Sequence, residues 1–101
     1  MSVVQKIDNK FSYVNLTADA LVKSGAGVIH TITFGQTDAA PTAGTITFYD
    51  NLAESGQVIY KHTFTTAIFY PASIVLDCIF GTGLYAGFDT TGDVSVTITY
   101  K

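Results

Sequence analysis

Large apolar side chains alternate with threonine in several short runs of the chain. The clearest are HTITF at residues 30–34, GTITFYD at residues 44–50 and VSVTITY at residues 94–100. A period of two places successive side chains on opposite faces, so each run predicts a strand with one buried and one wet face. Fifteen of the 101 residues are threonine, whose β-branched side chain favours extended backbone and covers a wet face without adding charge.

The remaining strands follow from the same alternation, interrupted by glycine, proline and aspartate. We expect strands at residues 12–17, 20–23, 28–34, 45–50, 57–64, 73–80, 84–88 and 94–100. In the third of these, alternation assigns one face to Val28, His30, Ile32 and Phe34, and the other to Ile29, Thr31 and Thr33.

Seven or eight short strands with turn signals every ~8–12 residues predict an all-β antiparallel sandwich. No segment has apolar residues at helical spacing over about ten residues with cap signals, so little or no helix is expected. Jelly-roll and immunoglobulin-like connections share this alternation, and both topologies stay open. We expect an extended N-terminal arm at residues 1–11 and a single sandwich domain at residues 12–101.

The composition of the chain limits the classes of binding partner that we expect. Charged residues make up 13% of the chain, the net charge is −3, and five lysines are scattered without any arginine. Nucleic-acid binding needs clustered cations, so we expect no nucleic-acid partner. No apolar run approaches the ~20 residues that span a bilayer, and the N-terminus lacks a signal-peptide pattern. We expect no membrane partner, and the low-charge, threonine-rich surface favours residence in an assembly.

The single cysteine, Cys78, excludes an intrachain disulfide and a cysteine zinc cage. It shares the inward face of its strand with Ile74, Leu76 and Phe80, so we interpret it as a small core residue and not a nucleophile. This cysteine content fits synthesis in a reducing cytoplasm.

Two histidines, His30 and His62, each lie on the apolar face of a predicted strand. They are either a metal pair or acid–base couple, or two part-buried rings satisfied by polar neighbours; we favour the second because no third ligand follows from the spacing. We therefore expect no catalytic, metal or cofactor site.

Loop carboxylates and tyrosines suggest two further candidate binding sites, one for calcium and one for a sugar or a protein. Asp89 and Asp93, with Asp50 if the loops cluster, suit calcium, but aspartate also starts turns and the calcium-loop spacing is absent. Tyr13, Tyr49 and Tyr85 suit an exposed aromatic surface for a sugar or a protein partner, although tyrosine is common in ordinary strands.

Five segments together carry a resemblance to a known class of protein. They are LVKSGAGVIHTITF, GTITFYDN, PASIVLD from Pro71 to Asp77, GTGLYAGF and DVSVTITY. Their order resembles small virion proteins of tailed bacteriophages, in particular capsid decoration (cement) proteins built on a β-sandwich. The likeness covers Leu21 to Tyr100 and consists of pattern and turn types, which also occur in tail and fibre-associated virion proteins.

The resemblance implies a non-enzymatic protein on the capsid exterior, made in the host bacterial cytoplasm. Its partner would be the major capsid protein, and it would form a homo-oligomer, with a trimer favoured. An arm carrying Val3, Val4, Ile7 and Phe11 would contact shell subunits. The alternative is a receptor- or carbohydrate-binding module of a phage tail or fibre. A small metal-dependent enzyme using His30 and His62 is a third hypothesis.

Overall fold

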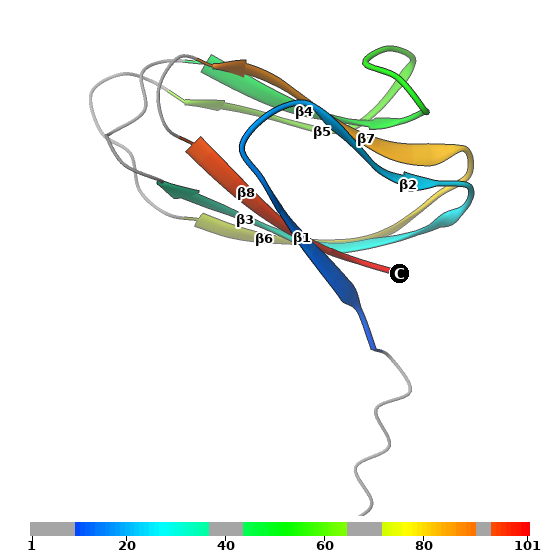
Figure 1. Cartoon of the computed structure of the whole chain (residues 1–101). Helices are drawn as coiled ribbons and strands as arrows, with labels where there is room; N and C mark the ends of the chain where they lie inside the picture. Colours follow the sequence, from blue (N-terminus) through cyan, green and yellow to red (C-terminus); the bar gives the residue numbers. More distant parts are fainter. Residues whose placement is uncertain (1–9, 37–43, 65–71, 91–93) are drawn as a thin grey trace, which may run out of the picture.

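The computed structural model describes residues 10–36, 44–64, 72–90 and 94–101. The secondary structure of these residues consists of eight strands (Figure 1). They are β1 Ser12–Leu16, β2 Ala20–Ser24, β3 Gly27–Gln36, β4 Gly44–Asp50, β5 Gln57–Phe64, β6 Ala72–Phe80, β7 Gly83–Thr90 and β8 Val94–Tyr100.

The strands form two four-stranded antiparallel sheets that stack as layers (Figure 1). Sheet A has the order β1-β8-β3-β6 and sheet B has the order β2-β7-β4-β5. The prediction of an all-β antiparallel sandwich is confirmed. Every connection crosses between the sheets except the β4–β5 hairpin, which is the eight-stranded jelly-roll arrangement. An immunoglobulin-like domain would instead place its first two strands in one sheet.

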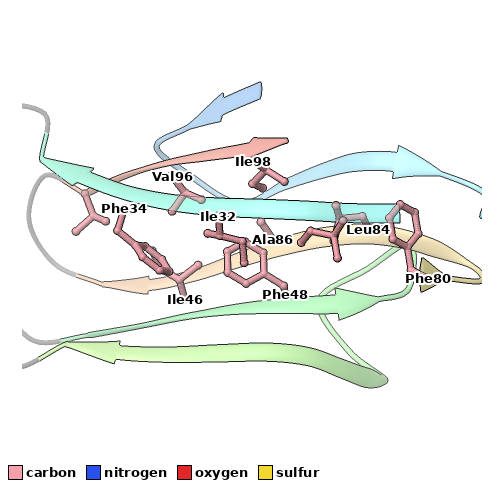
Figure 2. Close-up of a cluster of buried hydrophobic side chains, with 11 residues drawn as sticks. Ile32, Phe34, Ile46, Phe48, Phe80, Leu84, Ala86, Val96 and Ile98 are labelled. Atoms are coloured by element: carbon pink, nitrogen blue, oxygen red, sulfur yellow. The ribbon is translucent and has the colours of Figure 1, made fainter. Parts of the chain in front are cut away.

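The core lies between the inner faces of the two sheets (Figure 2). Strands β3, β6 and β8 supply one side and β4 and β7 the other. Its buried members are Ile29, Ile32, Phe34, Ile46, Phe48, Phe80, Leu84, Ala86, Val94, Val96 and Ile98. Full burial of one such large aliphatic or aromatic side chain stabilises the fold by roughly 1.5–3 kcal/mol, so this cluster is what holds the sheets together.

The predicted faces of the first residues of β3 are wrong for Val28, Ile29 and His30. His30 was expected on the buried face with Ile32, but its side chain is 34% exposed, whereas Ile29 is fully buried beside Ile32. Alternation therefore holds on either side of His30 and fails at it.

A β-bulge explains this change of phase. Against β8, Ile29 pairs with Tyr100 and Thr31 pairs with Thr99, so His30 is an extra residue in β3. A bulge leaves its extra residue outside the ladder and re-aims the side chain. His30 and Thr31 consequently both leave the core side of the sheet.

The C-terminal residue of the chain closes one end of sheet A. Lys101 and Val28 exchange two backbone hydrogen bonds of 2.8 Å each. The close approach requires glycine at position 27, where a Cβ atom would collide with the Lys101 carbonyl oxygen and lie 2.7 Å from Cζ of Phe80. This glycine allows the end of the chain and a core ring to meet.

We predict that Gly27→Ala lowers the free energy of unfolding by about 1–3 kcal/mol, the usual cost of overpacking. Urea unfolding followed by circular dichroism measures it. Gly81→Ala is the matched control, because the nearest atom to its Cβ would be Oδ2 of Asp50 at 4.0 Å. The control should be neutral or slightly stabilising. Equal effects of the two substitutions would contradict the steric account.

Candidate interaction surface

The outer face of sheet B is partly covered by the chain itself. The β4–β5 loop, residues 51–56, folds over β7, where Gly83 and Gly87 leave room for it. Cδ2 of Leu52 lies 2.7 Å from the place a Cβ would take at Gly83, and Cδ of Glu54 lies 2.8 Å from that of Gly87. Thr47 on the neighbouring β4 is consequently only 9% exposed.

An apolar row crosses sheet B beside this loop. Tyr49 of β4 pairs with Tyr85 of β7 on one side and with Val58 of β5 on the other. Tyr85 in turn pairs with Leu21 of β2. Both tyrosines are only partly exposed. Two of the three tyrosines singled out in the sequence therefore lie together, and Tyr13 lies in the other sheet.

The outer face of sheet A is lined by hydroxyl and amide side chains that bond to one another. Nδ2 of Asn15 donates to Oγ1 of Thr97 at 2.9 Å. The hydroxyls of Thr33 and Ser73 are 2.7 Å apart. These cross-strand bonds fix the side chains and cover the face without charge.

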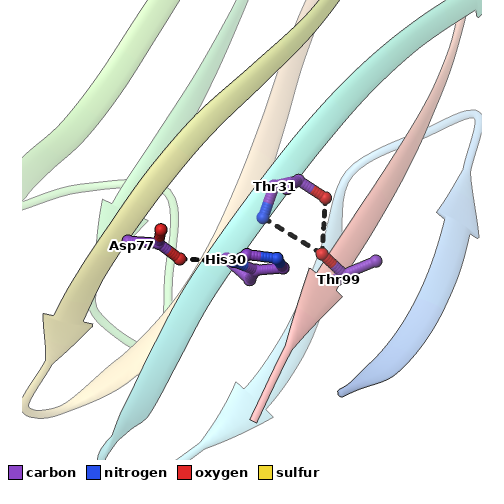
Figure 3. A network of polar contacts seen from close by, with 4 residues as sticks. All are labelled: His30, Thr31, Asp77 and Thr99. Atoms are coloured by element: carbon purple, nitrogen blue, oxygen red, sulfur yellow. Dashed lines mark hydrogen bonds and ion pairs between the residues drawn. The ribbon is translucent and has the colours of Figure 1, made fainter. Parts of the chain in front are cut away.

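The hydroxyl pairing continues beside His30 (Figure 3). The backbone N–H of Thr31 donates to Oγ1 of Thr99 at 3.0 Å, and the two threonine hydroxyls also bond to each other. The bulge at His30 thus leaves Thr31 in the ladder of outward-facing hydroxyls.

Three apolar side chains stand on this face with large exposure. Tyr13 of β1 is 75% exposed, and Val75 and Ile79 of β6 are 64% and 81% exposed. Sheet A therefore presents an open, polar but nearly uncharged surface with apolar side chains at both edges.

The titratable side chains His30, Asp77 and Lys101 have contacts within the chain on this face. Nδ1 of His30 contacts Oδ1 of Asp77 (Figure 3), and the ring of Phe11 stacks on His30 with centroids 4.2 Å apart. Nζ of Lys101 lies 5.6 Å from the Phe11 centroid, within range of a cation–π contact. Phe11, predicted as part of the arm, is thus held against sheet A, whereas Val3, Val4 and Ile7 lie outside the described residues.

The two histidines do not form one site. His62 stacks on the core ring of Phe34, with centroids 4.3 Å apart, and the hydroxyl of Tyr60 lies 3.3 Å from its Nδ1. Burial lowers the pKa of His62, because desolvation disfavours the charged ring. His30 lies instead on the outer face of sheet A. Within the described ranges, no three His, Cys, Asp or Glu side chains are grouped as a metal site would need.

The surroundings of Cys78 and of Asp50 indicate structural roles for both side chains. Burial, followed by the charge of Asp77, raises the pKa of the Cys78 thiol, which opposes thiolate formation. Both carboxylate oxygens of Asp50 accept backbone N–H bonds, from Gly81 at 2.9 Å and from Thr82 at 2.8 Å. These bonds lower the pKa of Asp50 and fix the β6–β7 turn. Asp89 is exposed, and Asp93 lies outside the described residues.

Comparison with protein-family models, with curated proteins and with solved structures gave no match. In the part of the chain that is described, no helix has the length and apolar character needed to cross a membrane. The interpretation of function therefore depends on the two outer faces described above.

We predict that the burial of His62 makes stability fall on mild acidification. Because its folded pKa is below the ordinary value of 6.5, the unfolded state binds more protons as the pH falls below ~6.5, and the free energy of unfolding decreases. His62→Phe, which keeps a ring on Phe34, should flatten the profile. Urea midpoints of both proteins between pH 8 and 5 measure this, in a range above the ordinary carboxyl pKa values of about 4. Parallel profiles would contradict it.

Proposed function

We propose that this protein is a non-enzymatic virion structural protein, a decoration protein that binds the outer surface of a phage capsid through the outer face of sheet A. The observation that carries the proposal is the difference between the two outer faces. Sheet B is partly closed by residues 51–56 over Gly83 and Gly87. Its exposed apolar side chains, Leu21, Leu52 and Val58, are 41–48% exposed, whereas Tyr13, Val75 and Ile79 of sheet A are 64–81% exposed. A sheet face with exposed apolar side chains is a candidate protein interface.

The chemistry of sheet A supports a protein partner. Interface cores are depleted in charged side chains, and on this face His30 and Asp77 already pair with each other. Docking would therefore desolvate few unpaired charges. The bonded hydroxyls, such as Thr33 with Ser73, lose little side-chain freedom when covered, which lowers the cost of association.

The proposal also names the partner, the oligomeric state and the location of the protein. The partner is the major capsid protein, and the protein acts as a homo-oligomer, with a trimer favoured, on the virion exterior after synthesis in the host bacterial cytoplasm. Several copies joined in one oligomer would bind neighbouring shell subunits with avidity that no single contact supplies. The sequence resemblance supports this class, and the jelly-roll fold, which also builds viral capsid and lectin domains, is compatible with it by analogy alone.

We predict that Val75→Lys on sheet A reduces binding to capsids by tenfold or more, because a charge is placed in the proposed interface; a fold-change of this size is about 1.4 kcal/mol. Val58→Lys is the matched control on the outer face of sheet B, where Val58 is 41% exposed. Co-sedimentation with purified, undecorated capsids of the source phage measures both. Weaker binding by the control alone would assign docking to sheet B, and no capsid binding by wild type would remove the proposal.

We also predict that deleting residues 1–10 weakens capsid attachment while leaving the domain folded. The truncation keeps Phe11 and its stack on His30, so only the arm before that ring is lost. Occupancy on virions, measured by quantitative mass spectrometry, should fall while the circular dichroism spectrum is unchanged. Normal occupancy of the truncated protein would exclude a role for the arm.

The apolar row across the outer face of sheet B favours a second candidate function, that of a carbohydrate- or receptor-binding module of a phage tail or fibre. The members of this row are Leu21, Tyr85, Tyr49 and Val58. Tyr49 and Tyr85 are cross-strand neighbours on one face, and paired aromatic rings suit stacking on sugars. A glycan array would show binding that Tyr85→Ala abolishes and Val75→Lys leaves unchanged. The capsid proposal expects no glycan binding.

A further inference from the structure

The outer face of sheet B has a raised half and a low half. The loop at residues 51–56 stands out from this sheet (Figure 1), and its side chains lie over Gly83 and Gly87 of β7. On the opposite side of β4, the edge strand β5 leaves Val58 41% exposed and Lys61 exposed. The face is therefore high over β7 and low over β5.

The two halves carry opposite charges at the same level of the sheet. Thr47 of β4 pairs with Lys61 of β5 on one side and with Gly87 of β7 on the other. The side chain of Glu54 lies over Gly87, so Lys61 and Glu54 stand on either side of β4, above strands about 10 Å apart. Both are exposed, and among the residues that the structure describes neither forms an ion pair.

The apolar row of sheet B lies next to this pair of charges. Tyr49 is its member on β4, two residues or about 7 Å along the strand from Thr47. At the ends of the row, Leu21 of β2 is 45% exposed and Val58 of β5 is 41% exposed. An apolar centre bordered by charged side chains is the usual composition of a protein interface.

A twofold axis along β4 makes this face complementary to itself. Rotation about such an axis exchanges the two sides of β4, so that β5 of one molecule faces β7 of the other. Lys61 of each copy then faces Glu54 of the other, and each raised loop lies on the low half of the opposite face. An axis across the strands would instead place β5 against β5 and each loop against its equivalent.

We propose that the outer face of sheet B binds a second copy of this chain about a twofold axis along β4, with Lys61 of each copy paired with Glu54 of the other. In a twofold contact every interaction occurs twice, so two ion pairs flank one shared apolar row. Sheets that pack face to face keep their strands within about 30° of each other, which allows the two rows to lie on one another.

This inference does not rest on the proposed function, because it concerns the isolated protein and leaves sheet A free for a capsid. A dimer would take the place of the trimer favoured in that proposal, and a failure of capsid binding would leave the pairing untouched. Below the dimer dissociation constant, the Val58→Lys control for capsid binding is unaffected by this contact.

Sedimentation velocity of the full-length chain over a range of concentrations tests the pairing. Wild type is expected to show a monomer–dimer equilibrium. Lys61→Glu and Glu54→Lys each place like charges opposite one another, and each is expected to raise the dimer dissociation constant by about tenfold or more. The double variant Lys61→Glu with Glu54→Lys restores opposite charges and is expected to recover most of the lost affinity.

Lys10→Glu is the matched control. It makes the same change of net charge at an exposed position before β1 of sheet A, and it should leave the dissociation constant unchanged. Circular dichroism shows that each variant keeps its fold. A wild-type protein that stays monomeric up to its solubility limit, or that forms a trimer, would overturn the proposal, as would a double variant that fails to pair. Glycan binding at this face by a monomeric protein would assign it to a sugar instead.

Discussion

The burial of side chains between the two sheets is the interaction on which the rest of the structure depends. Six of the seven connections pass from one sheet to the other, so neighbouring segments of sequence seldom bond to each other. What keeps β3 and β8 over β4 and β7 is the shared layer that contains Phe34, Phe48 and Ile98. Because this layer uses one side of every strand, the opposite sides remain for solvent or partners.

Much of the fold was predictable because burial imposes a period of two. Val94, Val96 and Ile98 lie in the core as their alternation indicates. The topology was not predictable, because inner and outer positions alternate alike in both candidate sandwiches. The position of His30 was missed for a related reason. Its bulge is defined by pairing with strands far along the chain, and residues 28–34 carry no local mark of it.

The outer faces were predictable only in part. Tyr49 and Tyr85 were singled out from composition, and they become neighbours through the pairing of β4 with β7. The sequence does contain a sign of the loop that covers sheet B. Gly83 and Gly87 lie at outward-facing positions of β7 and, having no side chains, leave room over that strand for Leu52 and Glu54. No feature of the sequence indicates that the outer face of sheet A is open, because that depends on which of the two sheets the loop at residues 51–56 covers.

The place of β8 has a consequence for how the chain acquires this structure. Of the six strand pairs, only β4 with β5 joins consecutive strands, and the bond between Asn15 and Thr97 closes a separation of 82 residues. Folds with such distant contacts form in about milliseconds to seconds. During translation β3 can pair with β6 before β8 has emerged, but β1 must wait for β8, which lies between β1 and β3. Sheet A is therefore expected to be complete only after the ribosome has released that strand, with the β4–β5 hairpin as the earliest native element.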